Sequence, residues 1–389
     1  MLTAAEAAAR LGVKRESLYA YVSRGMLDRR LSEDGRTSLF ALHDVERLRT
    51  ERRRGRPAST SIDLTVTTSL TQISDDGVWY RGVPLADIAG RWSFERAAEW
   101  LWHGVDDEHV RPWPRLRGLA APAHVAGARR IDDLVALTAV VAAGDRARGP
   151  ATAAVAGRRL IGAFADHFPV PAKRRPTRPI DGSIAARLAA RLGLPVPQDD
   201  LVSLVDTTLV ALADHDLASS TLAARIAAST RADAYGVVIS GLGVLTGPLH
   251  GAASGQVHRF LADAERAGDV AATVEAHLAA GERIPGFGHK IYRTVDPRYP
   301  LLLDALRRTG RDLAVVDTTV RVVHERLGLH PNVDLAIGAM SLSIGLPPDT
   351  GELLFAVART AGWLAHAIEE YDEAPVRYRP RAVYIGPRP

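Results

Sequence analysis

Four basic side chains stand close together in the stretch IPGFGHKIYRTVDPRYP, residues 284–300. They are His289, Lys290, Arg293 and Arg298, and the acidic residue among them is Asp296. Guanidinium groups bind carboxylates and phosphates through paired hydrogen bonds, and glycine lets a backbone approach a ligand closely. A stretch this rich in cations, with glycine and proline around them, predicts a loop that binds anionic substrates.

Further polar residues interrupt segments that are otherwise apolar. His215 lies between two aspartates in ALADHDLASST, and His250 lies between glycines in GPLHGAASG. Asp334 stands at an expected helix start in NVDLAIGAM, and Arg359 shares a helix face with two aromatic residues and a histidine. A carboxylate in apolar surroundings has a raised pKa and can act as a general base. These positions are candidates for acid–base chemistry and for anion binding.

Each of these positions also has a structural interpretation. A histidine in an apolar helix is often a hydrogen-bonded core residue, Asp334 could complement a helix dipole, and Arg359 could extend along apolar surface into solvent. The chain has no cysteine, and its histidines do not have the HxxxH or HExxH spacing of a helical metal site. We therefore expect no metal.

The composition is that of a globular protein. The chain has 389 residues, of which 47% are hydrophobic and 24% charged, so it is long enough for two or three domains. The absence of cysteine excludes disulfides and thiolate chemistry. The N-terminus does not have the pattern of a signal peptide, and no apolar run approaches the roughly 20 residues that span a bilayer. We expect no membrane association and a cytoplasmic location.

The elements that must position the polar residues are mainly helical. Apolar residues recur at helical spacing in SFERAAEWLWHG (93–104) and SIAARLAARLGL (183–194). A short β-like region with an Asp-Gly turn precedes them at 62–85, and the Pro-rich segment 166–182 is expected to be a surface loop. No βαβ alternation and no glycine-rich phosphate-binding fingerprint is present.

The N-terminal segment has its own charge balance. Residues 1–56 hold 13 Lys and Arg against 8 Asp and Glu, whereas the remainder holds 36 against 37. The sequence LTAAEAAARLGVKRESLYAYVSRGML predicts helix, turn, helix, with a capping box from Thr3 and Glu6 and a left-handed Gly12 after the first helix. Two short strands are expected around Asp34-Gly35.

This segment resembles the winged helix-turn-helix of the MerR and excisionase type. The second helix would present Lys14, Arg15, Ser17 and Tyr19 to a major groove, as a recognition helix does. The resemblance implies DNA binding through residues 1–56, and the basic stretch 49–60 could add phosphate contacts. The alternative is a small helical module for dimerisation or docking.

The remainder of the chain resembles the citrate synthase family over about residues 62–387. The motifs that carry the resemblance are DGVWYRGVPLADIAGRWSFERAAEWLWHG, GPLHG, GFGHKIYRTVDPR, NVD and ARTAGW, in the family's order and at about its spacing. The resemblance implies a mainly α, two-domain fold preceded by the small winged helix-turn-helix domain. We expect a large helical domain of residues 57–251 and 337–389 and a small helical domain of residues 252–336.

The resemblance also implies an activity. Acetyl-CoA, as a co-substrate, would condense with oxaloacetate, and hydrolysis of the thioester would give citrate and CoA, with no permanently bound cofactor. Asp334 would be the base, His250 would donate a hydrogen bond to the thioester oxygen, and His289 would polarise the oxaloacetate carbonyl. The enzyme would be a homodimer.

The same resemblance assigns residues to substrate binding. His215, Arg298 and Arg359 would bind oxaloacetate, together with Arg379, which the family supplies across the dimer interface. Arg293 would face the CoA phosphates, and the backbone around Phe287 would face the adenine.

The chain departs from the family pattern at four positions near the site. Leu212 and Ala218 stand where the family usually has His and Asn, Ser254 where it has Asn, and Ile337 where it has Ser. These changes leave two other functions open. One is 2-methylcitrate synthase using propionyl-CoA, and the other is a DNA-binding transcriptional regulator whose citrate synthase-like body senses metabolites.

Overall fold

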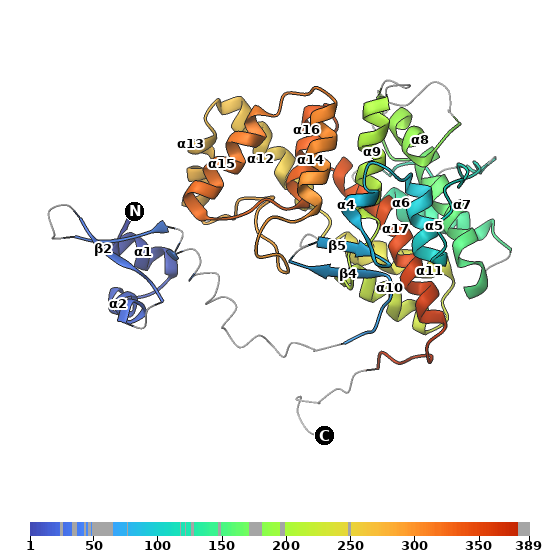
Figure 1. Cartoon of the computed structure of the whole chain (residues 1–389), viewed down its shortest axis with the longest axis horizontal. Helices are drawn as coiled ribbons and strands as arrows, with labels where there is room; N and C mark the ends of the chain where they lie inside the picture. Colours follow the sequence, from blue (N-terminus) through green and yellow to red (C-terminus); the bar gives the residue numbers. More distant parts are fainter. Residues whose placement is uncertain are drawn as a thin grey trace.

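The structure, a computed structural model, describes most of the 389 residues. The described ranges leave out residues 24–25, 33–36, 43, 46–47, 49–64, 76, 117, 121, 126–127, 147–148, 171–180, 195–198, 248–249 and 380–389. The described part is mainly helical, with two small antiparallel sheets (Figure 1). The predicted mainly α architecture is confirmed. The predicted turn at Asp34-Gly35 and most of the Pro-rich segment lie outside the described residues.

The described N-terminal residues include the helices α1 and α2 and a three-stranded sheet of order β1-β3-β2. The elements are β1 (Leu2–Thr3), α1 (Ala4–Leu11), α2 (Arg15–Ser23), β2 (Arg29–Leu31) and β3 (Ser38–Phe40). The capping box is present, because Glu6 N donates to Thr3 Oγ1 at 3.4 Å and Thr3 N donates to the Glu6 carboxylate at 2.8 Å. Gly12 has the predicted left-handed conformation, with φ of 64°. The sequence analysis missed the strand β1.

A second sheet, of order β4-β5-β6, precedes the helical body. Its strands are β4 (Thr71–Ser74), β5 (Gly77–Tyr80) and β6 (Val83–Pro84). The predicted β-like region is thus confirmed for residues 71–84. Tyr80 is buried at the end of β5, where its hydroxyl donates to the backbone oxygens of Val210 and Asp214, both at 3.0 Å. The sheet is thereby joined to the segment that holds His215.

The larger group of helices packs around one central helix, α17 (Thr350–Tyr371). Its neighbours include α5, α7, α9, α10 and α11, which lie around it in Figure 1. The helices of this group, besides α17, are α4 (Leu85–Ile88), α5 (Phe94–His103), α6 (Arg130–Ala143), α7 (Ala153–Asp166), α8 (Ile184–Arg191), α9 (Asp199–Leu212), α10 (Ser219–Ser229) and α11 (Ala234–Leu245). The predicted helices at 93–104 and 183–194 correspond to α5 and α8. Because α17 is buried on almost every side, its polar residues face other protein groups.

A second group of helices lies beside the first, in yellow and orange in Figure 1. It comprises α12 (Ala253–Ala267), α13 (Val270–Ala279), α14 (Arg298–Arg308), α15 (Ala314–Leu327) and α16 (Val333–Ser343). Within the group, α12 packs on α13, α15 and α16, and α14 packs on α16. The two groups meet where α14 packs on α9 and α12 packs on α17. The cation-rich stretch 284–297 connects α13 to α14 and so begins and ends in the second group.

Candidate active site

The cation-rich loop is hydrogen-bonded to the turn that precedes α16. Gly288 N donates to His330 O at 2.8 Å, and the backbone and side chain of Asn332 bond to Gly286 O and Gly288 O at 2.9 and 2.8 Å. Gly286 has φ of 83°, and a Cβ there would lie 2.9 Å from a methyl group of Val257. Only glycine fits this close approach. The loop therefore holds His289 next to the start of α16.

Asp296 connects the same loop to two elements. Its carboxylate accepts hydrogen bonds from Arg298 Nε and Nη2 at 3.0 and 2.8 Å and from Val333 N at 3.1 Å. Both Asp296 and Arg298 are buried. Burial opposes both charges, but their mutual attraction prevails, so the pKa of Asp296 is lowered and the pKa of Arg298 is raised. The pair fixes a buried guanidinium at the start of α14.

His215, His289 and Tyr292 contact one another, and the charge of Arg298 acts on both histidines. His215 Nε2 is 2.8 Å from Tyr292 Oη, and the ring centroids of His215 and His289 are 5.6 Å apart. Burial and Arg298 lower the pKa of both histidines, although Asp296 opposes this for His289. His289 Nδ1 accepts hydrogen bonds from the backbone N–H groups of Ile291 and Tyr292 at 3.1 and 3.4 Å. His289 is therefore neutral, with its proton on Nε2, where it can be donated to a ligand.

Arg359 of α17 is buried, so the alternative interpretation that it is a surface residue is wrong. Its Nε donates to Leu212 O at 2.9 Å, and its guanidinium carbon lies 4.6 Å from the ring centre of Phe355. Nη1 has no hydrogen-bond partner among the described residues. Burial lowers the pKa of Arg359 to about 10, and the nearby charge of Arg298 adds to this while Asp214 opposes it.

His250 follows α11 and contacts the ring of Phe355, which Arg359 also contacts. The centroids of the two rings are 6.0 Å apart, and His250 Nε2 is 2.9 Å from Ser220 Oγ. Burial, followed by the charge of Arg359, lowers the pKa of His250. A neutral imidazole whose Nε2 is held by a hydroxyl can present Nδ1 to a ligand.

Asp334 is at the start of α16, as predicted. Asn332 caps the helix, because its side-chain oxygen accepts a hydrogen bond from Asp334 N at 3.0 Å. Burial raises the pKa of Asp334 to about 6, with Arg298 lowering it and Asp296 raising it. A carboxyl group with this pKa is ionised at neutral pH but remains more basic than an exposed aspartate.

The structure brings six of the predicted site residues into one cluster, in which the charges of two arginines act on three histidines and an aspartate. They are His215, His250, His289, Arg298, Asp334 and Arg359. Phe287 is half-buried in the adjoining loop, whereas Arg293 and Arg379 are exposed. Among the described residues, no hydrogen bond or ion pair joins Arg293 or Arg379 to the cluster.

Three contacting residues were missed as site residues by the sequence analysis. Asp296 was noted only as the single acid among cations, although its position two residues before Arg298 allows a bidentate pair. Tyr292 could have been found from its spacing, because it follows His289 by three residues in one motif. No sequence signal identifies Ser220, which lies on α10, whereas His250 lies in the turn between α11 and α12.

The four departures from the family pattern lie at the end of α9, at the N-cap of α10, on α12 and on α16. Leu212 is buried and contributes the backbone oxygen that Arg359 binds. Ala218 is the N-cap of α10 and supplies no capping side chain. Ser254 and Ile337 are buried against Gly351, where an added Cβ would lie 2.5 Å from each side chain. Leu212, Ala218 and Ile337 have apolar side chains, whereas Ser254 has a hydroxyl group.

Neither a membrane-spanning helix nor a metal-binding cluster is present among the described residues. None of their helices is both long enough and apolar enough to cross a membrane. The same residues contain no cluster of three or more His, Asp or Glu side chains that could hold a metal ion.

Comparison with known proteins places this fold in one family. The family model described as "Citrate synthase, C-terminal domain" matches residues 62–381. A citrate synthase from Haloferax volcanii is 37% identical over 209 residues, 52% of this chain and 55% of that protein. A 2-methylcitrate synthase from Corynebacterium glutamicum is 32% identical over 187 residues, 46% of this chain and 49% of that protein. The chain thus spans about half the length of these curated relatives.

The fold is also similar to solved structures. A citrate synthase from Thermoplasma acidophilum, in a ternary complex with carboxymethyl coenzyme A and oxaloacetate, superposes with a TM-score of 0.72 at 24% identity. The match covers 85% of this chain and 95% of that one. At this identity the likeness establishes the fold, and it includes both helix groups.

Proposed function

The chain belongs to the citrate synthase family, and we propose that it condenses acetyl-CoA with oxaloacetate and hydrolyses the thioester to citrate and CoA. The observation that carries the proposal is the pairing of two buried guanidiniums, Arg298 and Arg359, with a carboxyl group of pKa about 6 at Asp334. A dicarboxylate needs the first two groups, and removal of a weakly acidic methyl proton needs the third. The proposed large domain, 57–251 with 337–389, and the proposed small domain, 252–336, would supply the two faces of such a site, and the boundary between them at 336/337 falls within α16.

In the first step Asp334 takes a proton from the acetyl methyl group. The electron pair moves onto the thioester oxygen, where a hydrogen bond from His250 stabilises the developing charge. Ser220 Oγ, 2.9 Å from Nε2 of His250, orients that imidazole. The low pKa of His250 keeps it neutral, so it acts as a hydrogen-bond donor and not as a competing positive charge.

In the second step the methyl carbon attacks the carbonyl carbon of oxaloacetate. His289 Nε2–H would polarise the carbonyl oxygen, because Nδ1 is already occupied by two backbone donors. The new bond gives an alkoxide that takes up a proton, and water then cleaves the thioester to release CoA. His215, Arg298 and Arg359 would hold the carboxylates of oxaloacetate.

A thiol-release assay with acetyl-CoA and oxaloacetate tests the proposal. We expect turnover by the wild type and a loss of at least about 100-fold in Asp334→Asn, as for a lost general base. Wild-type protein that is silent with acetyl-, propionyl- and butyryl-CoA would contradict it. Faster turnover of propionyl-CoA than acetyl-CoA would instead favour 2-methylcitrate synthase, an activity that a relative carries in its name.

We also propose a homodimer in which Arg379 completes the oxaloacetate site of a second copy. The outward faces of α10 and α11 support this, because they carry Ile226 and Ile239 exposed by 42% and 38% and no exposed charged residue. Mixing Arg379→Ala protein with Asp334→Asn protein tests it. If Arg379 acts across the interface, one site of each mixed dimer is intact and activity returns. No recovery after subunit exchange would overturn the assignment.

For residues 1–56 we propose a winged helix-turn-helix that binds DNA, and a regulatory role could then accompany catalysis. The proposal is supported by α1 and α2 with the sheet β1-β3-β2, by the exposed Lys14, and by the excess of basic residues. We expect weak duplex binding that fades with salt and disappears when residues 1–56 are deleted. Equal binding by the truncated protein would refute it. A metabolite-dependent DNA affinity without turnover would favour the regulator alone.

A further inference from the structure

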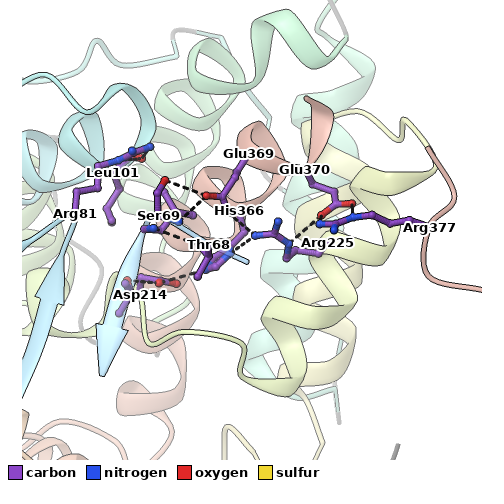
Figure 2. Close-up of polar contacts among 12 residues, drawn as sticks. Thr68, Ser69, Arg81, Leu101, Asp214, Arg225, His366, Glu369, Glu370 and Arg377 are labelled. Atoms are coloured by element: carbon purple, nitrogen blue, oxygen red, sulfur yellow. Dashed lines mark hydrogen bonds and ion pairs between the residues drawn. The ribbon is translucent and has the colours of Figure 1, made fainter. Parts of the chain in front are cut away.

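A buried chain of polar side chains leads from the oxaloacetate side of the proposed site to the C-terminal segment (Figure 2). It begins at Asp214, which precedes His215 in the sequence. Asp214 is fully buried. Asp214 Oδ2 accepts hydrogen bonds from Thr71 Oγ1 at 2.5 Å and from His366 Nε2 at 3.3 Å. Burial alone would raise the pKa of Asp214, but His366 and Arg359 lower it, so it is an anion beside the site.

His366 passes this contact on to Arg225. Arg225 Nη1 is 2.8 Å from His366 Nδ1, and an arginine can only donate. His366 Nδ1 is therefore an acceptor, and its ring proton lies on Nε2, which faces Asp214. The geometry fixes both the tautomer of His366 and the direction of the hydrogen bonds, from Arg225 through His366 to Asp214.

Arg225 lies between two glutamates at the end of α17. Its Nη1 is 2.6 Å from Glu369 and its Nε is 3.0 Å from Glu370. Glu370 is buried as well and accepts two hydrogen bonds from Arg377, at 2.7 and 2.6 Å, and one from Tyr378 Oη at 2.9 Å. The network thus leaves the core and ends two residues before Arg379.

The backbone of the C-terminal segment is strained at this place. Val376 has φ of 55°, which is unfavourable for a β-branched residue. Its N–H donates to Ser229 O at 2.9 Å, and Arg231 donates to the backbone oxygens of Glu370 and Glu373 at 3.2 and 2.7 Å. A strained conformation persists where its surroundings determine it strongly, and such positions cluster at functional sites.

We propose that the network Asp214–His366–Arg225–Glu370–Arg377 is a positioning device for Arg379. It fixes the direction in which the C-terminal segment leaves α17, so that Arg379 reaches the oxaloacetate site of a second copy. Its other end holds the segment that carries His215 in its own site. Arg377 is then a positioning residue that acts through Arg379. The inference rests on the proposed function and on the proposed role of Arg379.

Arg377→Gln tests the device, because the Arg377 side chain is 26% exposed and the buried pair Arg225–Glu370 remains in the variant. We expect KM for oxaloacetate to rise about tenfold, kcat to change less than about threefold and KM for acetyl-CoA to stay constant. Arg379→Gln should have the larger effect, and the double variant should be no worse than Arg379→Gln. An unchanged KM, or effects that multiply in the double variant, would overturn the proposal.

Arg266→Gln is the matched control, because Arg266 forms a 2.8 Å ion pair with Asp263 on the exposed face of α12. It should leave all three constants unchanged. Hydrogen exchange of the full chain adds a measurement that does not depend on turnover. The Val376 amide should exchange at least about tenfold faster in Arg377→Gln and at the wild-type rate in Arg266→Gln.

The two measurements separate the possible failures. If the wild type releases no thiol, the proposed function fails, and calorimetric binding of oxaloacetate to the wild type and Arg377→Gln decides the positioning role. Weaker binding together with faster exchange in the variant supports that role. Unchanged exchange at Val376 overturns it, even in an active enzyme.

Discussion

Two buried arginines on neighbouring helices have opposite electrostatic surroundings. Arg225 of α10 contacts the carboxylates of Glu369 and Glu370, and these attractions, with Tyr378, raise its pKa although burial opposes them. Arg359 of α17 forms no ion pair among the described residues, and burial lowers its pKa to about 10. One nitrogen of each guanidinium lacks a hydrogen-bond partner there, so the neutralising charge is what distinguishes them.

For these two arginines, the difference separates a charge that is neutralised by carboxylates of the chain from one that forms no ion pair among the described residues. A buried cation without a counter-charge is costly, and a protein retains it where a ligand supplies the missing anion. Arg359 fits this description, because Phe355 and a backbone oxygen orient it without neutralising it. Arg225 is neutralised within the chain and serves the arrangement of α10, α17 and the C-terminal segment.

Replacing Arg225 removes the charge that Glu369 and Glu370 neutralise, and it should have the largest effect. Arg225→Gln leaves Glu369 and Glu370 without their shared cation, so we expect the free energy of unfolding to fall by about 3–5 kcal/mol. Urea denaturation followed by circular dichroism measures this. A loss below about 1 kcal/mol would mean that Arg377 and solvent already neutralise the glutamates.

Replacing Arg359 should weaken substrate binding. Arg359→Gln removes a charged contact to a substrate carboxylate, which corresponds to a loss of about 100-fold in kcat/KM for oxaloacetate. The free energy of unfolding should change by less than about 1 kcal/mol, because the lost charge had no counter-ion. A large loss of stability with wild-type kcat/KM would reverse the assignment of the two arginines.

The part of the site that sequence could predict is the part written in contiguous motifs. His289 and Arg298 fall within one signature, and Asp334 lies two residues after its capping residue Asn332, so their local geometry was foreseeable. The capping box of Thr3 and Glu6 was predicted for the same reason. The helical class also followed, because apolar spacing along each helix is a local property.

The network around Arg225 could not be predicted from the sequence. Its members are separated by about 140 to 150 positions, and pairing across such a distance depends on the packing of α10 against α17. Glu369 and Glu370 end a long helix, where acidic residues usually face solvent. The burial of Arg359 was equally hidden, because an arginine among apolar residues is compatible with a surface position.

Asp206 and Asp334 are also a pair of like residues, because both are acids with raised pKa values. Burial and the charge of Glu95 raise the pKa of Asp206 to about 7, although the hydrogen bond from Phe94 N, at 2.8 Å, opposes this. Asp206 is on α9, outside the cluster. A raised pKa alone therefore does not identify a catalytic base.

Asp206→Asn should stabilise the protein in a pH-dependent way. The folded pKa lies above the unfolded value, so ionisation costs wild-type stability as pH rises from about 4 to about 7. Asparagine cannot ionise and can still accept the hydrogen bond from Phe94 N. We expect its advantage in unfolding free energy to grow by about 3 kcal/mol between pH 5 and pH 8. An advantage independent of pH would show that Asp206 is already ionised in the folded protein.

The pH profile of activity should report Asp334 and not Asp206. The base must be ionised, so kcat/KM should fall about tenfold between pH 7 and pH 5 as Asp334, with its pKa of about 6, takes up a proton. Burial lowers the pKa values of His250 and His289, so their neutral forms extend to lower pH than those of an exposed histidine. Asp206→Asn is the control and should reproduce the wild-type profile. A profile that is flat from pH 7 to pH 5, in protein that stays folded, would mean that another group removes the proton.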